Sequence, residues 1–393
     1  MITYFTSITA NYLPKARVLA RSVKRYDPVS RFVLVLADFL PDGVDIENEP
    51  FDRIVFIEDL DIPDLQPWIF KHSVVELCTA VKGPVMLKLL LEQPVGEGVI
   101  YLDPDIVVFS SLDDLKEELR MADGLLTPHQ VEPESDPQAV IDNEICSLKH
   151  GVYNIGFLAL NHNPGGLSVA KWWKQRLLDH CFADIPNGLF TDQKWCDLIP
   201  CFFPGVRIYR HKGCNVATWN LTHRDVVIKE NGMLFVNDVP LVFYHFSGFD
   251  SGAQEVMLNR YAKKNSPLIE LRAWYIAECN KAGQIELGAR PGKFDFFSNG
   301  EKVTKAMRLL YRSRADLQNV FKTPYTTSGD IPGFYGWFVH TWPKENGQTG
   351  DTSAAYQEQL VALEKKLAKI SSSKSFQLAR VLRKPWRVIN PNA

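Results

Sequence analysis

The sequence predicts an α/β fold built on a mainly parallel sheet, with a helical extension toward the C-terminus. Short apolar runs recur in the first half of the chain, as at 32–36 and 53–57, and each ends in acidic or turn residues. Such nearly continuous apolar strands are typical of parallel sheets that helices cover on both faces. Helical patterns then dominate from about residue 251 to residue 322. In folds of this class, ligands bind at the carboxyl ends of the strands.

The spacing of apolar residues predicts the individual elements. Residues 2–8 are expected to form the first strand, and the next apolar residues share one helical face: Leu13, Ala16, Leu19, Ala20 and Val23. Further strands are predicted at 99–102 and 153–161, and further helices at 86–92 and 169–180. The acidic, proline-containing stretch VEPESDPQAVIDNE (131–144) predicts a mobile loop.

The predicted organisation has four parts. The main α/β domain is expected at 1–250 and the helical extension at 251–322, followed by a linker at 323–352, where Pro, Gly and Thr are frequent. The last part, 353–393, is predicted to contain a short helix and a basic tail.

Composition excludes several functional classes. A net charge of −2 argues against nucleic acid as a partner, because binding to phosphates requires a basic face. The seven cysteines show no CxxC pattern, which favours reduced thiols over disulfides or a zinc site. The N-terminal residues do not have a signal-peptide pattern, and no apolar run approaches 18 residues. We therefore expect a cytoplasmic protein.

Two aspartates, Asp103 and Asp105, follow the apolar run 99–102 in the segment YLDPDIVVF. In an extended chain, residues i and i+2 point to the same side, so the two carboxylates can converge on one point. At about 4 Å they repel each other by several kcal/mol at intermediate dielectric, and a bound cation relieves that repulsion. Oxygen ligands suit Mg²⁺ or Mn²⁺, which also take phosphate oxygens. The alternative is a surface turn in which Asp-Pro-Asp only ends the strand.

Four stretches, in this order, resemble segments of nucleotide-sugar glycosyltransferases of the GT-A fold, in particular family 8. YLDPDIVVF resembles their Asp-x-Asp segment, and YNIGFLALN (153–161) resembles the strand that lines the donor site. TDQKWCDLIP (191–200) is similar to their Asp-Gln helix start, and VFYHFSGFD (242–250) to the strand that brings a histidine to the metal. CNVATWNLTHR (214–224) resembles the stretch between the last two in bacterial relatives. The resemblance covers about residues 1 to 250.

The resemblance implies a GT-A (Rossmann-like) nucleotide-diphospho-sugar transferase fold and assigns roles to residues. Asp103, Asp105 and His245 would bind Mn²⁺ or Mg²⁺, and Asn154, Asp192 and Gln193 would lie at the reacting sugar. These enzymes carry an arginine in the helix before the Asp-x-Asp segment; here Met86 stands near that place, and Lys88 or Lys82 is expected to substitute for it. The expected donor-binding residues are Thr6, Thr9, Asn11, Lys88, Asp103 and Asp105. The Lys-Pro-Trp that follows the histidine and glycine in family 8 is absent.

Each of these residues also has a structural explanation. His245 lies in an apolar strand and could be a hydrogen-bonded core histidine. Asn154 could be a turn or strand-edge residue, and Asp192 with Gln193 could begin a helix that Thr191 caps. His129 and His223 are expected to be structural or to face the acceptor.

The expected function is metal-dependent transfer of a sugar from a nucleotide-diphosphate donor, such as a UDP-sugar, to a glycan or lipid-linked glycan. The resemblance implies retention of anomeric configuration and a role in bacterial surface polysaccharide synthesis, of O-antigen, lipopolysaccharide or capsule type. The alternative is a non-catalytic module that binds glycan or acts as a scaffold on a degenerate transferase fold. The intact Asp-Pro-Asp and His245 favour the enzyme.

The C-terminal residues suggest two further contacts. Apolar residues at 356, 360, 363, 367 and 370 have coiled-coil spacing, which predicts self-association, a partner helix or packing on the chain's own domain. Residues 371–393 carry five basic and no acidic side chains, interleaved with apolar ones. This predicts peripheral contact with an anionic membrane, at the inner face of the plasma membrane, or else a solvated tail.

Overall fold

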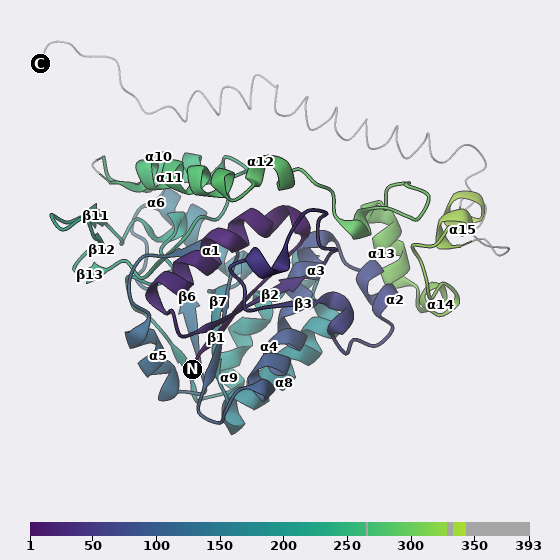
Figure 1. The fold of residues 1–393 in the computed structure, drawn as a ribbon, viewed down its shortest axis with the longest axis horizontal. Helices are drawn as coiled ribbons and strands as arrows, with labels where there is room; N and C mark the ends of the chain where they lie inside the picture. The colour runs from purple at the N-terminus through teal and green to yellow at the C-terminus, as the bar shows by residue number, and fades with distance from the viewer. Residues whose placement is uncertain (265, 328–332, 343–393) are drawn as a thin grey trace, which may run out of the picture. The chain divides into compact units, whose positions relative to one another are not determined.

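The computed structural model describes residues 1–264, 266–327 and 333–342. Its central element is a seven-stranded sheet (Figure 1). The strands are β1 (Thr3–Ile8), β2 (Arg31–Leu36), β3 (Arg53–Phe56), β4 (Gly98–Leu102), β6 (Gly124–Pro128), β7 (Tyr153–Asn161) and β10 (Val206–Ile208). They lie in the order β10-β6-β7-β4-β1-β2-β3.

Most neighbouring strands of this sheet are parallel. β1 pairs in parallel with β2 and with β4, β2 with β3, and β6 with β10. β7 is the exception, because it runs antiparallel to both β4 and β6. The start of β7 therefore lies beside the carboxyl end of β4, with Phe157 opposite Leu102. The predicted α/β fold with a mainly parallel sheet is confirmed.

Helices cover both faces of the sheet. Helix α1 (Leu13–Tyr26) buries Ala16, Leu19 and Val23 in a core cluster with alternate residues of β1, β2 and β4. Helix α4 (Lys82–Glu92) lies on the other face, because its Lys82 stands over the ring of Tyr101, whose neighbours Ile100 and Leu102 face α1. Helix α8 (Pro164–His180) lies beside α4 (Figure 1). A side chain at Gly83 would meet the backbone of Lys174 at 2.8 Å, so this close packing requires glycine.

A second, two-stranded sheet follows the Asp-Pro-Asp turn. β5 (Ile106–Val108) pairs antiparallel with β14 (Phe243–His245), and His245 lies opposite Ile106. The side chains of β5 are buried, as are those of β14. This pairing brings the histidine of the later segment next to the two aspartates.

The other described elements are shorter or lie after the sheet. Helices α2 (Leu65–Phe70) and α3 (Val74–Ala80) precede the Asp-Pro-Asp turn, and α5 (Asp113–Arg120) follows β5. Between β7 and β14 lie β8 (Ala183–Asp184), β9 (Leu189–Phe190), α9 (Ile199–Phe202), β11 (Val226–Ile228), β12 (Leu234–Val236) and β13 (Val239–Pro240). The helical C-terminal region contains α10 (Ala253–Tyr261), α11 (Leu268–Lys281), α12 (Gln284–Leu287), α13 (Lys305–Ser313) and α14 (Ala315–Val320). Together with the sheet, this region confirms the predicted helical extension.

The stretch 131–144 was expected to be a loop, but much of it is helical. It contains α6 (Pro137–Ala139) and most of η4 (Val140–Ile145), a π-helical turn that continues into α7 (Cys146–His150). The Asp136 side chain accepts hydrogen bonds from the backbone N–H groups of Gln138 and Ala139, which caps the helix. Pro137 in the first turn fits this start. The loop prediction was wrong because the acidic residues and proline are helix-start signals here.

The chain divides into two compact units. The first comprises Met1–Phe296 and Gly300–Lys322, and the second Phe297–Asn299 and Thr323–Ala393. In the second unit, the Ser298 N–H donates to the Tyr325 carbonyl at 2.9 Å, and helix α15 (Phe334–His340) lies in the range predicted to be a linker. The boundaries at 250, 322 and 352 stay predictions. The helix at 356–370 and the tail at 371–393 lie outside the described residues. Within the described ranges, no helix is both long and apolar enough to span a bilayer.

Candidate active site

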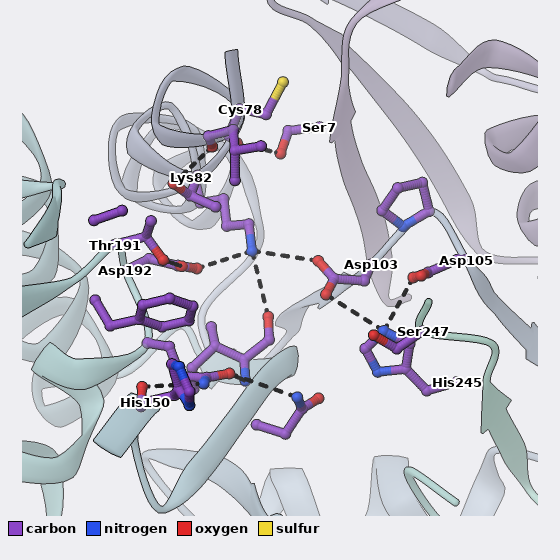
Figure 2. A pocket seen from close by; sticks show the side chains of 18 of the residues that line it. Ser7, Cys78, Lys82, Asp103, Asp105, His150, Thr191, Asp192, His245 and Ser247 are labelled. Atoms are coloured by element: carbon purple, nitrogen blue, oxygen red, sulfur yellow. Dashed lines mark hydrogen bonds and ion pairs between the residues drawn. The ribbon is translucent and has the colours of Figure 1, made fainter. Parts of the chain in front are cut away.

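A cavity of about 590 Å³ opens at the carboxyl ends of the central strands (Figure 2). Thr9 and Tyr12 line it after β1, and Asp103 and Asp105 line it after β4. From later in the sequence, β7, the segment 190–193 and β14 also contribute lining residues. The cavity therefore lies where an α/β fold is expected to bind its ligand.

Asp103, Asp105 and His245 converge at this cavity (Figure 2). His245 Nε2 lies 3.0 Å from Asp105 Oδ1 and 3.6 Å from Asp103 Oδ2. One ligand atom from each residue lies within 4.8 Å of the others. The structure thus brings together the three residues that the motif resemblance predicts as metal ligands.

Backbone hydrogen bonds hold the turn that carries the aspartates. The Asp103 N–H donates to the Gly156 carbonyl at 2.8 Å, and the Asp103 carbonyl accepts from Ile106 N–H at 3.0 Å. The Asp105 carbonyl accepts from Phe246 N–H at 2.8 Å. The backbone that carries the two aspartates is therefore tied to β7 on one side and to the end of β14 on the other.

The electrostatics favour a charged pair between Asp105 and His245. Burial opposes the charged form of both groups, but their mutual attraction outweighs it. As a result, the pKa of Asp105 is lowered and the pKa of His245 is raised. A divalent cation would take the place of the imidazole proton, because only the neutral ring can bind a metal. Two carboxylates and this nitrogen, directed at one point, then form a donor set that fits a divalent cation.

The ring of His245 is fixed by close packing. A side chain at Gly156 would meet His245 Cε1 at 2.5 Å and Nδ1 at 2.7 Å, so the imidazole lies directly against this glycine. Trp219 makes a T-shaped contact with the imidazole, with ring centroids 5.3 Å apart. These two contacts restrict the ring in the orientation that directs Nε2 at the carboxylates.

Lys82 connects Asp103 with Asp192. Its Nζ lies 2.8 Å from Asp192 Oδ2 and 3.3 Å from Asp103 Oδ1, and 4.1 Å from the ring centroid of Tyr101 (Figure 2). Burial alone would lower the pKa of Lys82, but the two carboxylates raise it well above its ordinary value. The Tyr101 hydroxyl donates to Asp103 Oδ1 at 2.5 Å. One buried cation therefore neutralises part of the negative charge of both carboxylates.

The segment around Asp192 differs from the predicted helix cap. Thr191 has a φ of 44°, and its hydroxyl donates to Asp192 Oδ1 at 3.0 Å. The following 3-10 helix, η6 (Lys194–Leu198), begins after Gln193 and receives no side-chain cap from it. Asp192 is buried with its carboxylate directed toward Lys82, so the helix-cap explanation for Thr191 was wrong.

Asn154 and Gln193 belong to one hydrogen-bonded network. Gln193 Oε1 accepts from Ile155 N–H at 3.2 Å and lies 3.5 Å from Asn154 Nδ2. Asn154 Oδ1 accepts from Gly156 N–H at 3.1 Å and from Asn215 Nδ2 at 3.0 Å. Both residues line the cavity. The network fixes the start of β7, which also carries the glycine that packs on His245.

The donor-binding residues expected from the sequence do not all reach the cavity. Thr9 lines it, and its hydroxyl donates to Asn11 Oδ1 at 2.7 Å, whereas Thr6 and Asn11 are not among the lining residues. Lys88 does not line the cavity either, and its Nζ lies 3.9 Å from Glu92. Lys82 and Lys88 are six residues apart, or about one and two-thirds helical turns, so they point in different directions. The choice of Lys88 over Lys82 is therefore not supported by this placement.

Sequence reasoning missed several residues of the site. Tyr101 was expected only to be a strand residue, although its hydroxyl contacts Asp103. Asn215, in the stretch CNVATWNLTHR, bonds Asn154 and also donates to Thr127 Oγ1 at 2.8 Å. Its φ of 53° is the kind of conformation that asparagine tolerates best among residues other than glycine. The lining residues between 142 and 150 were missed because the sequence was expected to form a mobile loop up to residue 144, where the structure has helical turns.

Comparisons with known proteins find relatives that match only part of this chain. No family model matches the chain. YfnF of Bacillus subtilis (strain 168), described as uncharacterized, is 30% identical over 174 residues, which cover 44% of this chain and 57% of YfnF. YfnD of the same organism, also described as uncharacterized, is 24% identical over 208 residues, which cover 52% of this chain and 64% of YfnD. The match thus spans less than two thirds of either relative.

Several solved glycosyltransferase structures are remotely similar. The galactosyltransferase LgtC, in complex with donor and acceptor sugar analogs, is 17% identical with a TM-score of 0.40, covering 74% of this chain and 98% of LgtC. GlyE of Streptococcus pneumoniae TIGR4 is 16% identical with a TM-score of 0.38, covering 75% of this chain and 66% of GlyE. Mouse xyloside xylosyltransferase 1 is 14% identical with a TM-score of 0.35, covering 63% of this chain and 96% of that enzyme. At these identities and TM-scores, the structural similarity shows nothing about activity or substrate.

Proposed function

We propose that this protein is a GT-A glycosyltransferase of the family 8 kind, which transfers a sugar from a nucleotide-diphosphate donor to a glycan acceptor. The observation that carries the proposal is the convergence of Asp103, Asp105 and His245 in a cavity at the carboxyl ends of the central strands. Two carboxylates and a histidine in this position suit the recognition of a diphosphate through a divalent cation. Mn²⁺ or Mg²⁺ is the cation proposed, and a UDP-sugar the donor.

In the proposed transfer, the bond from the anomeric carbon to the phosphate oxygen breaks, and the nucleoside diphosphate leaves with the electron pair. The acceptor hydroxyl oxygen forms the new bond on the same face, which retains the anomeric configuration, and its proton passes to the departing phosphate. When bound at Asp103, Asp105 and His245, the cation would neutralise the charge that develops on the diphosphate.

The residues of the chain have distinct roles in this proposal. Asp192, held by Lys82 at 2.8 Å, provides a negative charge near the anomeric carbon as positive charge develops there. Asn154 and Gln193 are proposed to contact the sugar hydroxyls, because they line the cavity next to Asp192. Thr9 and Tyr12, after β1, border the space for the nucleotide.

The cellular role follows from the same proposal. We place the protein in the bacterial cytoplasm, where nucleotide sugars are made, at the inner face of the plasma membrane. There it would extend a lipid-linked glycan in the synthesis of surface polysaccharide. The basic tail at 371–393 is the proposed membrane contact.

The experiment is a screen of nucleotide sugars by thermal shift with Mn²⁺, followed by a donor-hydrolysis assay with and without EDTA. We expect one UDP-sugar to raise the melting temperature only with the cation, and to be hydrolysed slowly in the absence of acceptor. NMR of a transfer product should show the anomeric configuration of the donor. Binding of a nucleotide sugar without any turnover would instead support the non-catalytic binding module, and turnover undiminished in EDTA would exclude the role of the cation.

A further inference from the structure

A second cavity, of about 190 Å³, opens where the end of β5, the start of α5 and the segment after β10 meet. Ser110 lines it just after β5, Asp114 from α5, and Tyr209 and His211 from the chain after β10. None of its described lining residues also lines the first cavity. Pockets for drug-sized ligands measure roughly 300–1,000 Å³, so this cavity suits a smaller molecule.

Backbone hydrogen bonds hold the walls of this cavity together. The Phe109 N–H donates to the Val242 carbonyl at 2.8 Å, and the Val242 N–H donates to the Gly213 carbonyl at 2.8 Å. The Tyr209 N–H donates to the Leu126 carbonyl at 2.7 Å. The segments that carry the lining side chains are therefore joined to one another and to the central sheet.

The imidazole of His211 presents an unpaired donor. Its Nδ1 accepts from the Gly213 N–H at 3.2 Å, so the proton of the neutral ring lies on Nε2. Burial lowers the pKa of His211, an effect that Asp114 opposes and Arg224 strengthens, so the ring is neutral at pH 7. Within the described residues no acceptor binds the Nε2 proton, and this nitrogen keeps accessible surface.

Two hydroxyl groups and one carboxylate of the lining are also unpaired. Ser110 is 7% exposed, yet no described residue hydrogen-bonds its hydroxyl, and the same holds for the hydroxyl of Tyr209. Neither oxygen is among the unpaired polar atoms that are sealed from solvent, so each keeps accessible surface. Asp114 has no ion pair in the described part of the chain, whereas the neighbouring Ser111 hydroxyl donates to Asp113 at 2.7 Å. Polar groups at a small cavity that the protein leaves unpaired are available to a ligand.

These four groups together indicate the class of ligand. The Asp114 carboxylate repels an anion such as phosphate, whose oxygens would have no proton to offer it. An ammonium ligand can pair with Asp114, but it has no acceptor for the His211 N–H. Hydroxyl groups both donate and accept, so a ligand with several of them satisfies the carboxylate, the imidazole and both protein hydroxyls. A neutral sugar ring has this pattern, and its C–H groups suit the apolar side chains of Leu115 and Met233 in the same lining.

We propose that this second cavity is a carbohydrate-binding site that holds one neutral sugar ring. The ring belongs to a free monosaccharide or to one unit of a glycan, because both present the same hydroxyl groups. The inference goes beyond the proposed function, since the site is built from other residues than Asp103, Asp105 and His245 and binds a sugar without transferring it.

A methionine in the lining allows a local measurement. Met233 lines the second cavity and is 43% exposed, whereas none of the described residues that line the first cavity is a methionine. The chain has six methionines, so isotope-labelled methionine methyl groups give few NMR signals, and Met233→Leu assigns the signal of interest. Glucose, galactose, mannose and their methyl glycosides are titrated without nucleotide or cation, and the Met233 signal gives their affinities.

The variant Ser110→Ala/Tyr209→Phe removes two hydroxyl groups that bind nothing in the described chain. Because no hydrogen bond within the protein is lost, its melting temperature should match that of the unmodified chain. The sugar should bind at least about ten-fold more weakly, since two hydrogen bonds to it are missing. Ser247→Ala/Tyr12→Phe makes the same two changes in the first cavity and is the matched control, which should keep the full affinity at Met233.

We expect at least one of these sugars to shift the Met233 signal in a saturable way. Equal affinity for a methyl glycoside and its free sugar assigns the site to a unit of a glycan, and loss of binding on methylation assigns it to a free monosaccharide. The inference is overturned if no sugar shifts the signal, or if Ser110→Ala/Tyr209→Phe binds as tightly as the unmodified chain. It is also overturned if inorganic phosphate or methylammonium shifts the signal and the sugars do not. Calorimetry of UDP with Mn²⁺ on the same samples tests the proposed function separately.

Discussion

Lys82 and Asp192 form a buried ion pair, with Nζ 2.8 Å from Oδ2 and both side chains 4% exposed. The same ammonium lies 3.3 Å from Asp103, which the proposed function assigns to the cation. Lys82 thus links the carboxylate proposed for the cation to the carboxylate proposed for the reacting sugar. A change at Lys82 is expected to affect both.

The first prediction concerns this pair. Lys82→Met should lower the free energy of unfolding by about 3–5 kcal/mol, because it leaves a buried carboxylate without its partner. The double variant Lys82→Met/Asp192→Asn should recover part of that loss, since the unpaired charge is then gone. Urea denaturation at neutral pH in EDTA measures both values. A single variant as stable as the unmodified chain would show that the ion pair contributes nothing to the fold.

The second prediction concerns the cation ligands. Asp105→Asn should abolish the rise in melting temperature that Mn²⁺ and UDP cause together. It should also reduce transfer by more than about 100-fold, because loss of a residue that only hydrogen-bonds to a metal ligand already costs about 10- to 100-fold. Asp113→Asn, at an exposed position on α5, is the matched control and should behave like the unmodified chain. Thermal shift and donor hydrolysis give the two readouts. Full Mn²⁺ response in Asp105→Asn would rule out this aspartate as a ligand.

The third prediction concerns the glycine behind the histidine. Gly156→Ala would place a methyl group 2.5–2.7 Å from His245 and 2.7 Å from Asn154 Oδ1, so the imidazole must move. We expect the Mn²⁺ concentration needed for half-maximal activity to rise at least about ten-fold, because ligand orientation is lost. Gly292→Ala is the control, since its nearest contact would be an ordinary 3.4 Å. An unchanged Mn²⁺ requirement in Gly156→Ala would mean that the position of the ring does not matter for the cation.

The fourth prediction concerns the pH dependence of stability. His72 is enclosed by the rings of Trp68 and Phe182, its Nδ1 donates to the Trp68 carbonyl at 2.7 Å, and burial lowers its pKa to about 3. The charged groups that face it are Glu76, which opposes this shift, and Arg312 and Lys71, which add to it.

The sign follows from linkage. The unfolded chain binds a proton at His72 near pH 6.5 and the folded chain does not, so the free energy of unfolding falls as the pH drops from about 6.5 toward 3. This contribution is about 1.4 kcal/mol per pH unit in that window. His72→Gln should remove it, whereas His180→Gln, at an exposed histidine, should not. Urea denaturation between pH 7 and pH 5 tests this, and equal pH slopes for His72→Gln and the unmodified chain would contradict it.

Local sequence patterns were sufficient to predict the sheet and the two apolar runs that carry the three proposed ligands. Asp103 and Asp105 end a buried strand, and His245 ends another apolar run, so both positions follow from strand periodicity. The pairing of β5 with β14 could not be predicted in this way, because it joins segments far apart in sequence and leaves no local signal. Only the order of the motifs suggested that these residues meet.

The other differences arise from tertiary context. Lys82 and Lys88 were both candidates from the sequence, but the choice between them depends on where α4 begins and which side faces β4. Thr191 looks like a helix cap, yet its left-handed backbone conformation directs its hydroxyl to Asp192 instead. The composition of residues 131–144 favours a loop, whereas in the structure Asp136 and Pro137 begin a helix within this stretch. In each case a local preference was compatible with two structures, and packing selected one.

The pairing of β5 with β14 sets the positions of the proposed ligands, whatever the length of the chain between these two strands. Ile106 pairs with His245, and the Phe246 N–H binds the Asp105 carbonyl, so a few short-range bonds set the geometry. The cost of closing a loop grows only slowly with its length. Insertions in an exposed turn of that region, such as the one between β11 and β12, would therefore leave Asp103, Asp105 and His245 in place. Descendants of this chain can thus evolve new outer loops while keeping the same three proposed ligands together.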